Sequence, residues 1–128
     1  MEPQRSGRLG PSIVIAGAIG SALRWAIGEV MADPTMALLC VNTGGSLLLG
    51  MVLAHRRLRR RIWLTLGFCG GLTTFSGYSV LIAERFNDHR YGSAAGIAVG
   101  LIAIAGVGFL AGYSGLRWSQ TRPRVQRP

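Results

Sequence analysis

Four long apolar stretches dominate the chain, and short polar segments separate them. The first stretch, residues 11–31, carries no charge except Arg24 and Glu29. The other stretches carry no Asp, Glu, Lys or Arg and comprise residues 35–55, 62–83 and 91–113. Each is about 20 residues long, which is the length that an α-helix needs to cross roughly 30 Å of hydrocarbon. The pattern therefore predicts an all-α integral membrane protein with four transmembrane helices.

The segments outside these stretches are too short to hold a soluble domain. The connections are residues 32–34, 56–61 and 84–90. We expect residues 1–10 to form a flexible lead-in and residues 114–128 to form a basic tail, in which Trp118 lies at the membrane interface. We expect no cleaved signal peptide, because the first apolar stretch is long and no small-residue cleavage site follows it. The four-helix membrane domain is thus assigned to residues 11–113.

Composition supports the membrane assignment and changes how the charge is interpreted. Apolar residues make up 49 % of the chain, and charged residues make up 15 %, against roughly 25 % in ordinary soluble domains. The net charge is nevertheless +9, from fourteen arginines, no lysine and five acids. Basic charge often indicates a nucleic-acid partner, but the mean hydropathy of +0.36 favours membrane lipid as the surroundings of this chain. We therefore expect no nucleic-acid partner.

The positions of the arginines predict a single orientation, because Lys and Arg accumulate on the cytoplasmic side of membranes. Four spans place both termini and the second connection on one side. That side holds eleven arginines, namely Arg5, Arg8, Arg56, Arg57, Arg59, Arg60, Arg61, Arg117, Arg122, Arg124 and Arg127. The other side holds Arg85 and Arg90 with the acids Glu29, Asp33, Glu84 and Asp88. We therefore expect both termini in the cytoplasm.

Motifs of catalysis or metal binding by side chains are missing from the sequence. Cys40 and Cys69 lie inside spans without CxxC spacing, and His55 and His89 lie at span ends without ligand spacing. There is no Ser-His-Asp set, no paired intramembrane carboxylate and no phosphate-binding loop. We predict that the protein is not an enzyme.

Small residues spaced four apart predict close helix packing at two spans, because close approach drives helix association in lipid. The first span carries Ser12, Ala16 and Gly20 at this spacing. The last span carries two such series, Gly92, Gly96 and Gly100, and then Gly108 and Gly112.

The third apolar stretch has an irregular centre. Gly70 and Gly71, followed by Thr73 and Thr74, weaken helix continuity and can release backbone carbonyls. Irregular backbone at this depth occurs only where it is buried in protein or lines a polar cavity. Released carbonyls suit a small alkali cation. The alternative is a glycine kink with threonines bonded back to their own helix, and these residues alone do not decide between the two.

A polar stripe follows this irregular centre. Thr73, Ser76 and Ser79 recur every three residues, and Phe75 and Tyr78 form a neighbouring stripe. Hydroxyls beside aromatic ring edges suit a small anion, because both present positive charge to it. Packing explains each residue alone, whereas the combination favours a permeation path.

Two further polar residues lie inside spans. Asn42, with Ser46 one turn later, can donate its amide to an anion. Arg24 lies about two-thirds along the first span, where an ionisable residue is expensive and is functional by default, although it can reach an interface by snorkelling. An anion-attracting role and a structural role both remain open for Arg24.

Three motifs stand in an order typical of one family. Residues 20–25 read GSALRW, residues 41–45 read VNTGG, and residues 67–76 read GFCGGLTTFS. With its span count and length, the chain resembles the fluoride channel family, Fluc, also called CrcB. The resemblance implies a passive, fluoride-selective channel that lowers the fluoride concentration in the cytoplasm of bacteria and lies in the cell membrane. It also implies an antiparallel dimer with two pores and a structural, untransported sodium ion at the dimer centre.

The resemblance assigns roles to individual residues. Gly70 and Thr73 match the positions whose backbone oxygens hold the sodium ion, at a break in the centre of the third helix. Asn42 matches the pore asparagine, Arg24 the first-helix arginine, and Phe75 the first of two pore phenylalanines. We therefore expect the fluoride pore to be formed by Asn42, Phe75, Ser76, Ser79 and the residue at position 78.

The chain departs from the family pattern in two places. Tyr78 replaces the second pore phenylalanine, and the last span has no hydroxyl between Ser93 and Tyr113. We therefore expect one pore to be altered or silent. Because an antiparallel homodimer must insert in both orientations, the arginine bias predicts a heterodimer with an oppositely oriented paralogue.

Two other functions compete with this hypothesis. A small multidrug-type proton-coupled exporter is also a compact four-helix dimer, but it requires a membrane-embedded carboxylate, for which Glu29 is the sole candidate. The other alternative is a non-conducting assembly subunit of a fluoride channel.

Overall fold

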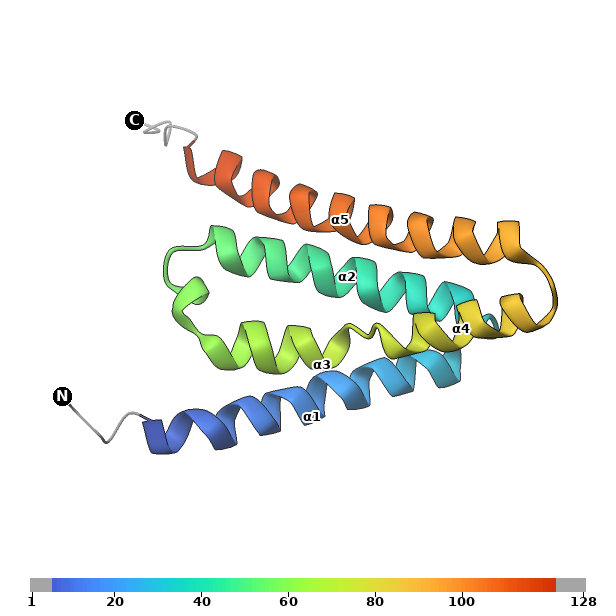
Figure 1. Cartoon of the computed structure of the whole chain (residues 1–128). Helices are drawn as coiled ribbons and strands as arrows, with labels where there is room; N and C mark the ends of the chain where they lie inside the picture. The colour runs from blue at the N-terminus through green and yellow to red at the C-terminus, as the bar shows by residue number, and fades with distance from the viewer. Residues whose placement is uncertain (1–5, 122–128) are drawn as a thin grey trace.

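The computed structural model describes residues 6–121, which are helical with short connections and contain no strand. Helical segments long and apolar enough to cross a membrane are Leu9–Val30, Pro34–Ala54, Trp63–Asn87 and Tyr91–Thr121. They run alternately in opposite directions (Figure 1). The prediction of an all-helical, multi-pass membrane protein with four spans is confirmed.

The helices follow one another with short connections. Helix α1 is Ser6–Val30, α2 is Pro34–Ala54, and the short 3₁₀ turn η2 is Leu58–Arg60. The third span comprises the π-helix η3 (Trp63–Cys69), α3 (Gly70–Leu72) and α4 (Ser76–Asn87). Helix α5 is Tyr91–Thr121.

The first and last helices are longer than the apolar stretches that predict them. Helix α1 begins at Ser6, so residues 6–10 are helical where a flexible lead-in was expected. Helix α5 continues to Thr121, so the first part of the expected basic tail is helical as well. Hydropathy marks the part of a helix that suits lipid, whereas backbone hydrogen bonding continues into the polar interface. Residues 1–5 and 122–128 lie outside the described part of the chain.

Local hydrogen bonds and backbone conformation in the short connections determine where helices start and end. The Asp33 carboxylate accepts from the N–H of Thr35 at 2.8 Å and of Met36 at 3.4 Å, and Pro34 occupies the first turn of α2. Both are strong helix-start signals, since they satisfy or remove N–H groups that have no partner within the helix. After α4, His89 adopts a left-handed conformation with φ 57° and turns the chain into α5.

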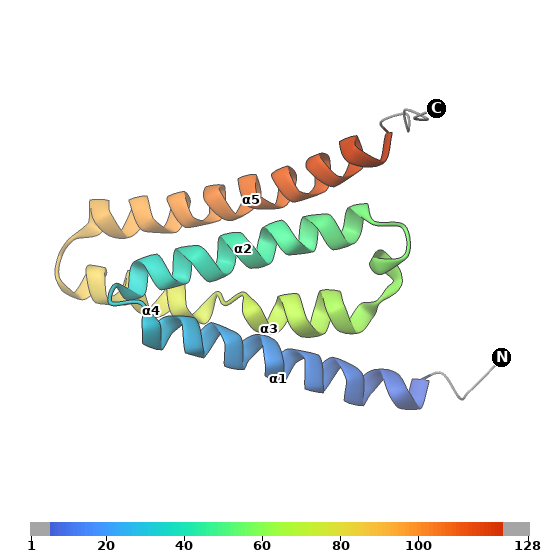
Figure 2. The ribbon, with the colours of Figure 1, turned by 180° about the vertical axis from the view of Figure 1, so that it is seen from behind.

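Helix α2 lies between α5 and the third span, and α1 packs on the other side of the third span, against η3 and α3 (Figures 1 and 2). Glycines allow α2 and α5 to approach closely. A Cβ on Gly108 would lie 2.9 Å from the Thr43 carbonyl oxygen, and one on Gly112 would collide with that of Leu47. This second glycine series of the last span is therefore a packing face.

The other glycine series of the last span behaves differently. A Cβ added to Gly92, Gly96 or Gly100 would meet no atom within 4 Å. The expectation of close packing at this series is therefore not met within the described chain. Many large apolar side chains are likewise exposed, such as Val14 and Val99, as expected of helices that face lipid or another subunit.

One buried hydroxyl yields a stability prediction. Thr43 Oγ1 is buried between α2 and α5 and has no hydrogen-bond partner among the described residues. Replacing it with the isosteric valine removes an unsatisfied polar group, so Thr43→Val should stabilise the protein by about 1 kcal/mol. The free energy of unfolding in mixed detergent micelles measures the effect.

The matched control is Thr65→Val, because the Thr65 hydroxyl donates to the Ile62 carbonyl at 3.2 Å. It should bring no gain in stability. A loss of stability in Thr43→Val would show that the Thr43 hydroxyl has a partner in the membrane.

Candidate functional site

Helical hydrogen bonding is interrupted at the centre of the third span. The Thr73 N–H still donates to the Cys69 carbonyl at 3.0 Å, and the regular pattern resumes where the Ser79 N–H donates to the Phe75 carbonyl at 3.0 Å. Between them Thr73 is extended, with φ −82° and ψ 151°. Among the described residues, the carbonyls of residues 70–74 therefore accept no helical backbone hydrogen bond. A segment of α2 and a segment of α1 approach this interruption.

Asn42 of α2 bonds directly to the interruption. Its side chain is 5 % exposed, and its Oδ1 accepts from the Thr74 N–H at 2.8 Å. In an uninterrupted helix that N–H would donate to the carbonyl of Gly70. Asn42 Nδ2 donates to the Leu38 carbonyl at 2.9 Å, and the same amide interacts with the Tyr78 side chain. Asn42 thus diverts the Thr74 N–H away from the helix.

Side chains of α1 bond to the released carbonyls. Arg24 Nη1 donates to the Thr73 carbonyl at 3.3 Å, and Ser21 Oγ donates to the Gly71 carbonyl at 3.3 Å. The approach depends on small residues, because a Cβ on Gly20 would collide with the Phe68 carbonyl. Arg24 therefore has a structural contact, which is one of the two roles left open by the sequence.

Gly70 differs from its neighbours. It is exposed, and a Cβ added to it would meet no atom within 4 Å. Its carbonyl accepts no hydrogen bond from a described residue, whereas those of Gly71 and Thr73 are bonded to α1. A released carbonyl on the apolar surface of a membrane helix needs a ligand or a partner, because lipid offers neither.

The polar stripe after the interruption is divided between two environments. The Thr73 hydroxyl donates back to the Cys69 carbonyl at 2.9 Å, as in the alternative of a kinked helix. Ser76 and Ser79 are exposed, and Ser79 Oγ donates to the Phe75 carbonyl at 3.2 Å. The stripe therefore presents only the two serines at the surface of the chain.

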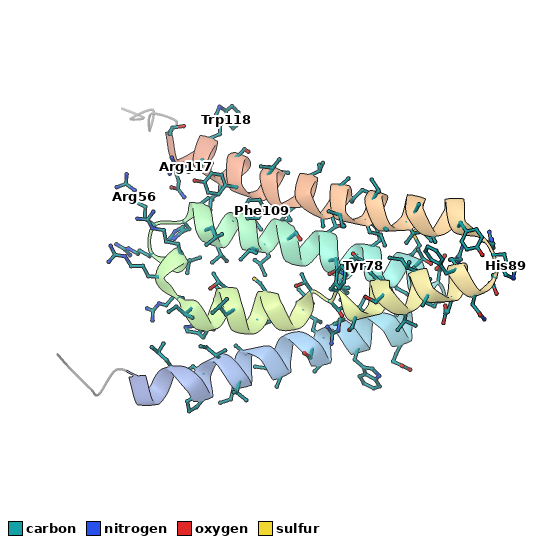
Figure 3. All side chains as sticks on the ribbon, viewed as in Figure 1. Arg56, Tyr78, His89, Phe109, Arg117 and Trp118 are labelled. Carbon is teal, nitrogen blue, oxygen red and sulfur yellow. The ribbon has the colours of Figure 1, made fainter. Side chains whose placement is uncertain are left out.

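The two aromatic residues of the candidate pore also lie in different surroundings. Phe75 is 72 % exposed, whereas Tyr78 is 7 % exposed and lies between α4 and α2 (Figure 3). The Tyr78 hydroxyl donates to the Leu38 carbonyl at 3.4 Å, which also accepts from Asn42. Tyr78 and Asn42 thus share one acceptor inside the chain, while Phe75 projects from it.

Arg24 also lines a hollow between the end of α1 and the start of α2. Its volume is about 270 Å³, and its other lining residues are Gly28, Pro34, Ala37, Leu38 and Val41. Because most of these side chains are apolar, the guanidinium is the main charge that an entering anion would meet. The anion-attracting role proposed for Arg24 is therefore compatible with its structural contact.

Three residues of this site, Ser21, Thr74 and Leu38, were not among the predicted site residues. Ser21 lies one turn before Arg24, so its position on the same helix face was a usable signal. Thr74 Oγ1 accepts from the Gly77 N–H at 3.4 Å and pairs with Ser76 Oγ at 2.9 Å, which is typical of a threonine at a helix start. The carbonyl of Leu38 left no signal, because every residue has one.

The residues present fit a cation held by backbone oxygens. No group of three or more His, Cys, Asp and Glu side chains that could hold a metal occurs among residues 6–121, so side-chain ligation of that kind has no candidate there. The free Gly70 carbonyl and the Thr73 carbonyl are hard oxygen donors of the type that sodium accepts. A carbonyl oxygen has two lone pairs, so Thr73 can bond to Arg24 and still face a cation.

Comparison with known proteins identifies relatives over most of the chain. A family model described as CrcB-like protein, Camphor Resistance (CrcB), matches residues 12–116. The fluoride-specific ion channel FluC of Bordetella avium is 35 % identical over 104 residues, which are 74 % of this chain and 80 % of the relative. FluC 1 of Yersinia pestis is 32 % identical over 74 % of this chain and 81 % of its own length, and FluC 2 of Natronomonas pharaonis is 37 % identical over 70 % and 78 %.

Proposed function

The chain belongs to the CrcB-like family, and on that premise we propose that it is a subunit of a fluoride-selective channel that passively exports fluoride from the bacterial cytoplasm. Its relatives are named as fluoride-specific ion channels, which are not enzymes. The observation that carries the proposal is the interrupted third span, where Asn42 and Arg24 hold an irregular backbone open inside a membrane domain.

The path proposed for fluoride combines groups that can replace its water. Fluoride is small and strongly hydrated, so a pore must offer close donors. The Arg24 guanidinium lowers the cost of an anion in an apolar hollow, and the amide of Asn42 and the hydroxyls of Ser76 and Ser79 are groups that can donate to it. Phe75 offers a ring edge. Because Phe75 and both serines are exposed, a second subunit would complete the path.

The proposed sodium ion would be held by the backbone oxygens of Gly70 and Thr73 from each of two subunits. When bound, it supplies a fixed positive charge that holds the released carbonyls together. The free carbonyl and open surroundings of Gly70 support this assignment. The antiparallel arrangement of the two subunits belongs to the same proposal.

The proposed orientation rests on the distribution of charge. The start of α1, the η2 connection and the end of α5 lie at one end of the molecule (Figure 1). That end holds most arginines, and the acids of α1 and α4 lie at the other end. We place the arginine-rich end in the cytoplasm, with both termini. This fixed orientation favours a heterodimer with a paralogue, and relatives numbered FluC 1 and FluC 2 are known.

The structure bears on the two alternative functions, a proton-coupled exporter and a non-conducting assembly subunit. Glu29, the candidate carboxylate of a proton-coupled exporter, is exposed at the next-to-last residue of α1, so it lies at the end of the first span and not at its centre. A non-conducting assembly subunit is favoured by Tyr78, whose ring lies within the chain and whose hydroxyl donates to Leu38. The second alternative is therefore kept as an outcome of the test.

Reconstitution in liposomes tests the proposal. Liposomes that contain this chain alone should release fluoride at the background rate. Co-expression with a paralogue of opposite arginine bias should raise the rate of efflux at least about tenfold over that of either chain alone. A fluoride electrode measures efflux, and chloride efflux is the selectivity control. Rapid fluoride efflux from this chain alone would refute the heterodimer but not the channel. A partnered channel that keeps its full rate when the pore residues of this chain are replaced would identify an assembly subunit.

A further inference from the structure

One end of the molecule carries a concentration of arginine without acidic neighbours. The connection between α2 and η3 contains Arg56, Arg57, Arg59, Arg60 and Arg61, and the last part of α5 contributes Arg117. The described acids, Glu29, Asp33, Glu84 and Asp88, all lie at the opposite end of the helices. Glu2 lies outside the described residues. The described chain therefore offers no carboxylate that would neutralise this end.

Two adjoining hollows lie among these arginines. The larger, of about 540 Å³, is lined by Arg56, Arg57, Arg60 and Arg61. The smaller, of about 230 Å³, is lined by Arg56, Arg117, Gln120 and Thr121. Arg56 lines both, and Figure 3 shows it near Arg117 at the ends of α2 and α5. Arg59 belongs to the same connection but lines neither hollow.

The ends of the spans place these hollows near the depth expected for lipid headgroups. Helix α2 ends at Ala54 and the third span begins at Trp63, so the arginine connection sits where two spans leave the hydrocarbon. Trp63 and Trp118 are 38 % and 62 % exposed at this end, and tryptophan is enriched at the membrane interface. The Arg117 guanidinium, which lines the smaller hollow, also lies 5.7 Å from the centre of the Tyr113 ring, within the range of a cation–π contact.

We propose that these hollows form a binding site for the phosphate group of an anionic phospholipid. Guanidinium groups bind phosphate through paired hydrogen bonds, and several of them converge here without a competing carboxylate. The Gln120 amide beside Arg117 can bond to the polar part of a glycerol headgroup. The site needs neither fluoride conduction nor a particular leaflet, so it stands independently of the proposed function.

An orientation signal and a phosphate site make different predictions for these arginines. An orientation signal depends on the number of basic residues on a side, so Arg56 and Arg59 would count equally. A phosphate site requires a difference between them, because only Arg56 lines the hollows. Either substitution leaves the large arginine bias in place, so insertion of the chain is preserved in both variants.

The test uses the full-length protein in nanodiscs of phosphatidylcholine with or without phosphatidylglycerol. Native mass spectrometry counts the phosphatidylglycerol molecules that stay bound to the protein after it is released from the nanodisc. Arg56→Gln should lower the affinity for phosphatidylglycerol at least about tenfold, as expected when a charge-assisted hydrogen bond worth about 1.5 kcal/mol or more is lost. Arg117→Gln should act similarly, whereas Arg59→Gln should change the affinity less than twofold.

Equal effects of Arg56→Gln and Arg59→Gln would overturn the proposal, since they would indicate diffuse attraction. A second arm titrates inorganic phosphate into the protein in nanodiscs of phosphatidylcholine alone. Weak binding of phosphate supports a lipid ligand, whereas binding as tight as that of phosphatidylglycerol would identify a soluble anion instead. Equal retention of phosphatidylcholine and phosphatidylglycerol would also contradict the site.

Discussion

Replacing Asn42 with leucine is expected to reduce fluoride efflux roughly 30- to 150-fold, because the side chain then no longer accepts the Thr74 N–H. Leucine has a similar volume, so packing between α2 and the third span is largely kept. The unpaired N–H costs about 2–3 kcal/mol in the buried site, or returns to the Gly70 carbonyl and closes the interruption. Either outcome removes the backbone arrangement on which the proposed path depends.

The measurement is fluoride efflux from liposomes that contain the channel with its partner, normalised to the amount of inserted protein. Asn87→Leu is the matched control, because Asn87 ends α4 and is exposed. It should leave efflux unchanged. An Asn42→Leu channel that conducts within about threefold of the native rate would rule out the contact with Thr74 as a requirement.

Valine at two neighbouring glycines is expected to give two different defects. At Gly71 a Cβ would collide with the Gly17 carbonyl of α1, and neither backbone can yield without separating α1 from the third span. Gly71→Val should therefore prevent stable folding. At Gly70 a Cβ meets no atom within 4 Å, so Gly70→Val should leave the fold of the subunit intact. It should instead prevent assembly, if a second subunit packs at the free Gly70 carbonyl.

Thermal unfolding in detergent detects the folding defect expected of Gly71→Val. Chemical cross-linking in liposomes detects the assembly defect expected of Gly70→Val. We expect Gly70→Val to retain an unfolding midpoint within a few degrees of the native value while the cross-linked dimer falls at least about tenfold. An intact and conducting Gly70→Val dimer would place the subunit contact elsewhere. A stable Gly71→Val subunit would contradict the close approach of α1.

Much of the architecture was predictable because hydropathy and local chemistry act over short distances. A scarcity of charge over about 20 residues predicts each span, and Asp33 followed by Pro34 is a local signal that agrees with the observed start of α2. The ends of α1 and α5 were predicted less well. Helical hydrogen bonds extend beyond the apolar residues at Ser6 and at Thr121, and hydropathy does not report them.

The two glycine series of α5 show the same difference between what local sequence predicts and what packing decides. Spacing of four residues indicates a face of small side chains, and it is identical for the series at Gly92 and at Gly108. Only Gly108 and Gly112 meet α2, because the position of α5 relative to α2 decides which face is covered. Gly92 belongs to a face that the described chain leaves open. Spacing therefore predicts that a face exists, whereas packing decides what covers it.

The sequence by itself determined the four spans, the concentration of arginine at one end and the weak centre of the third span, since each depends on residues close together in the chain. Only the tertiary structure decided how that centre is held. Asn42 reaches Thr74 across 32 residues, and Arg24 reaches Thr73 across 49. Hydrogen bonds require donors and acceptors within about 3.5 Å, so these pairs exist only after α1, α2 and the third span have packed together.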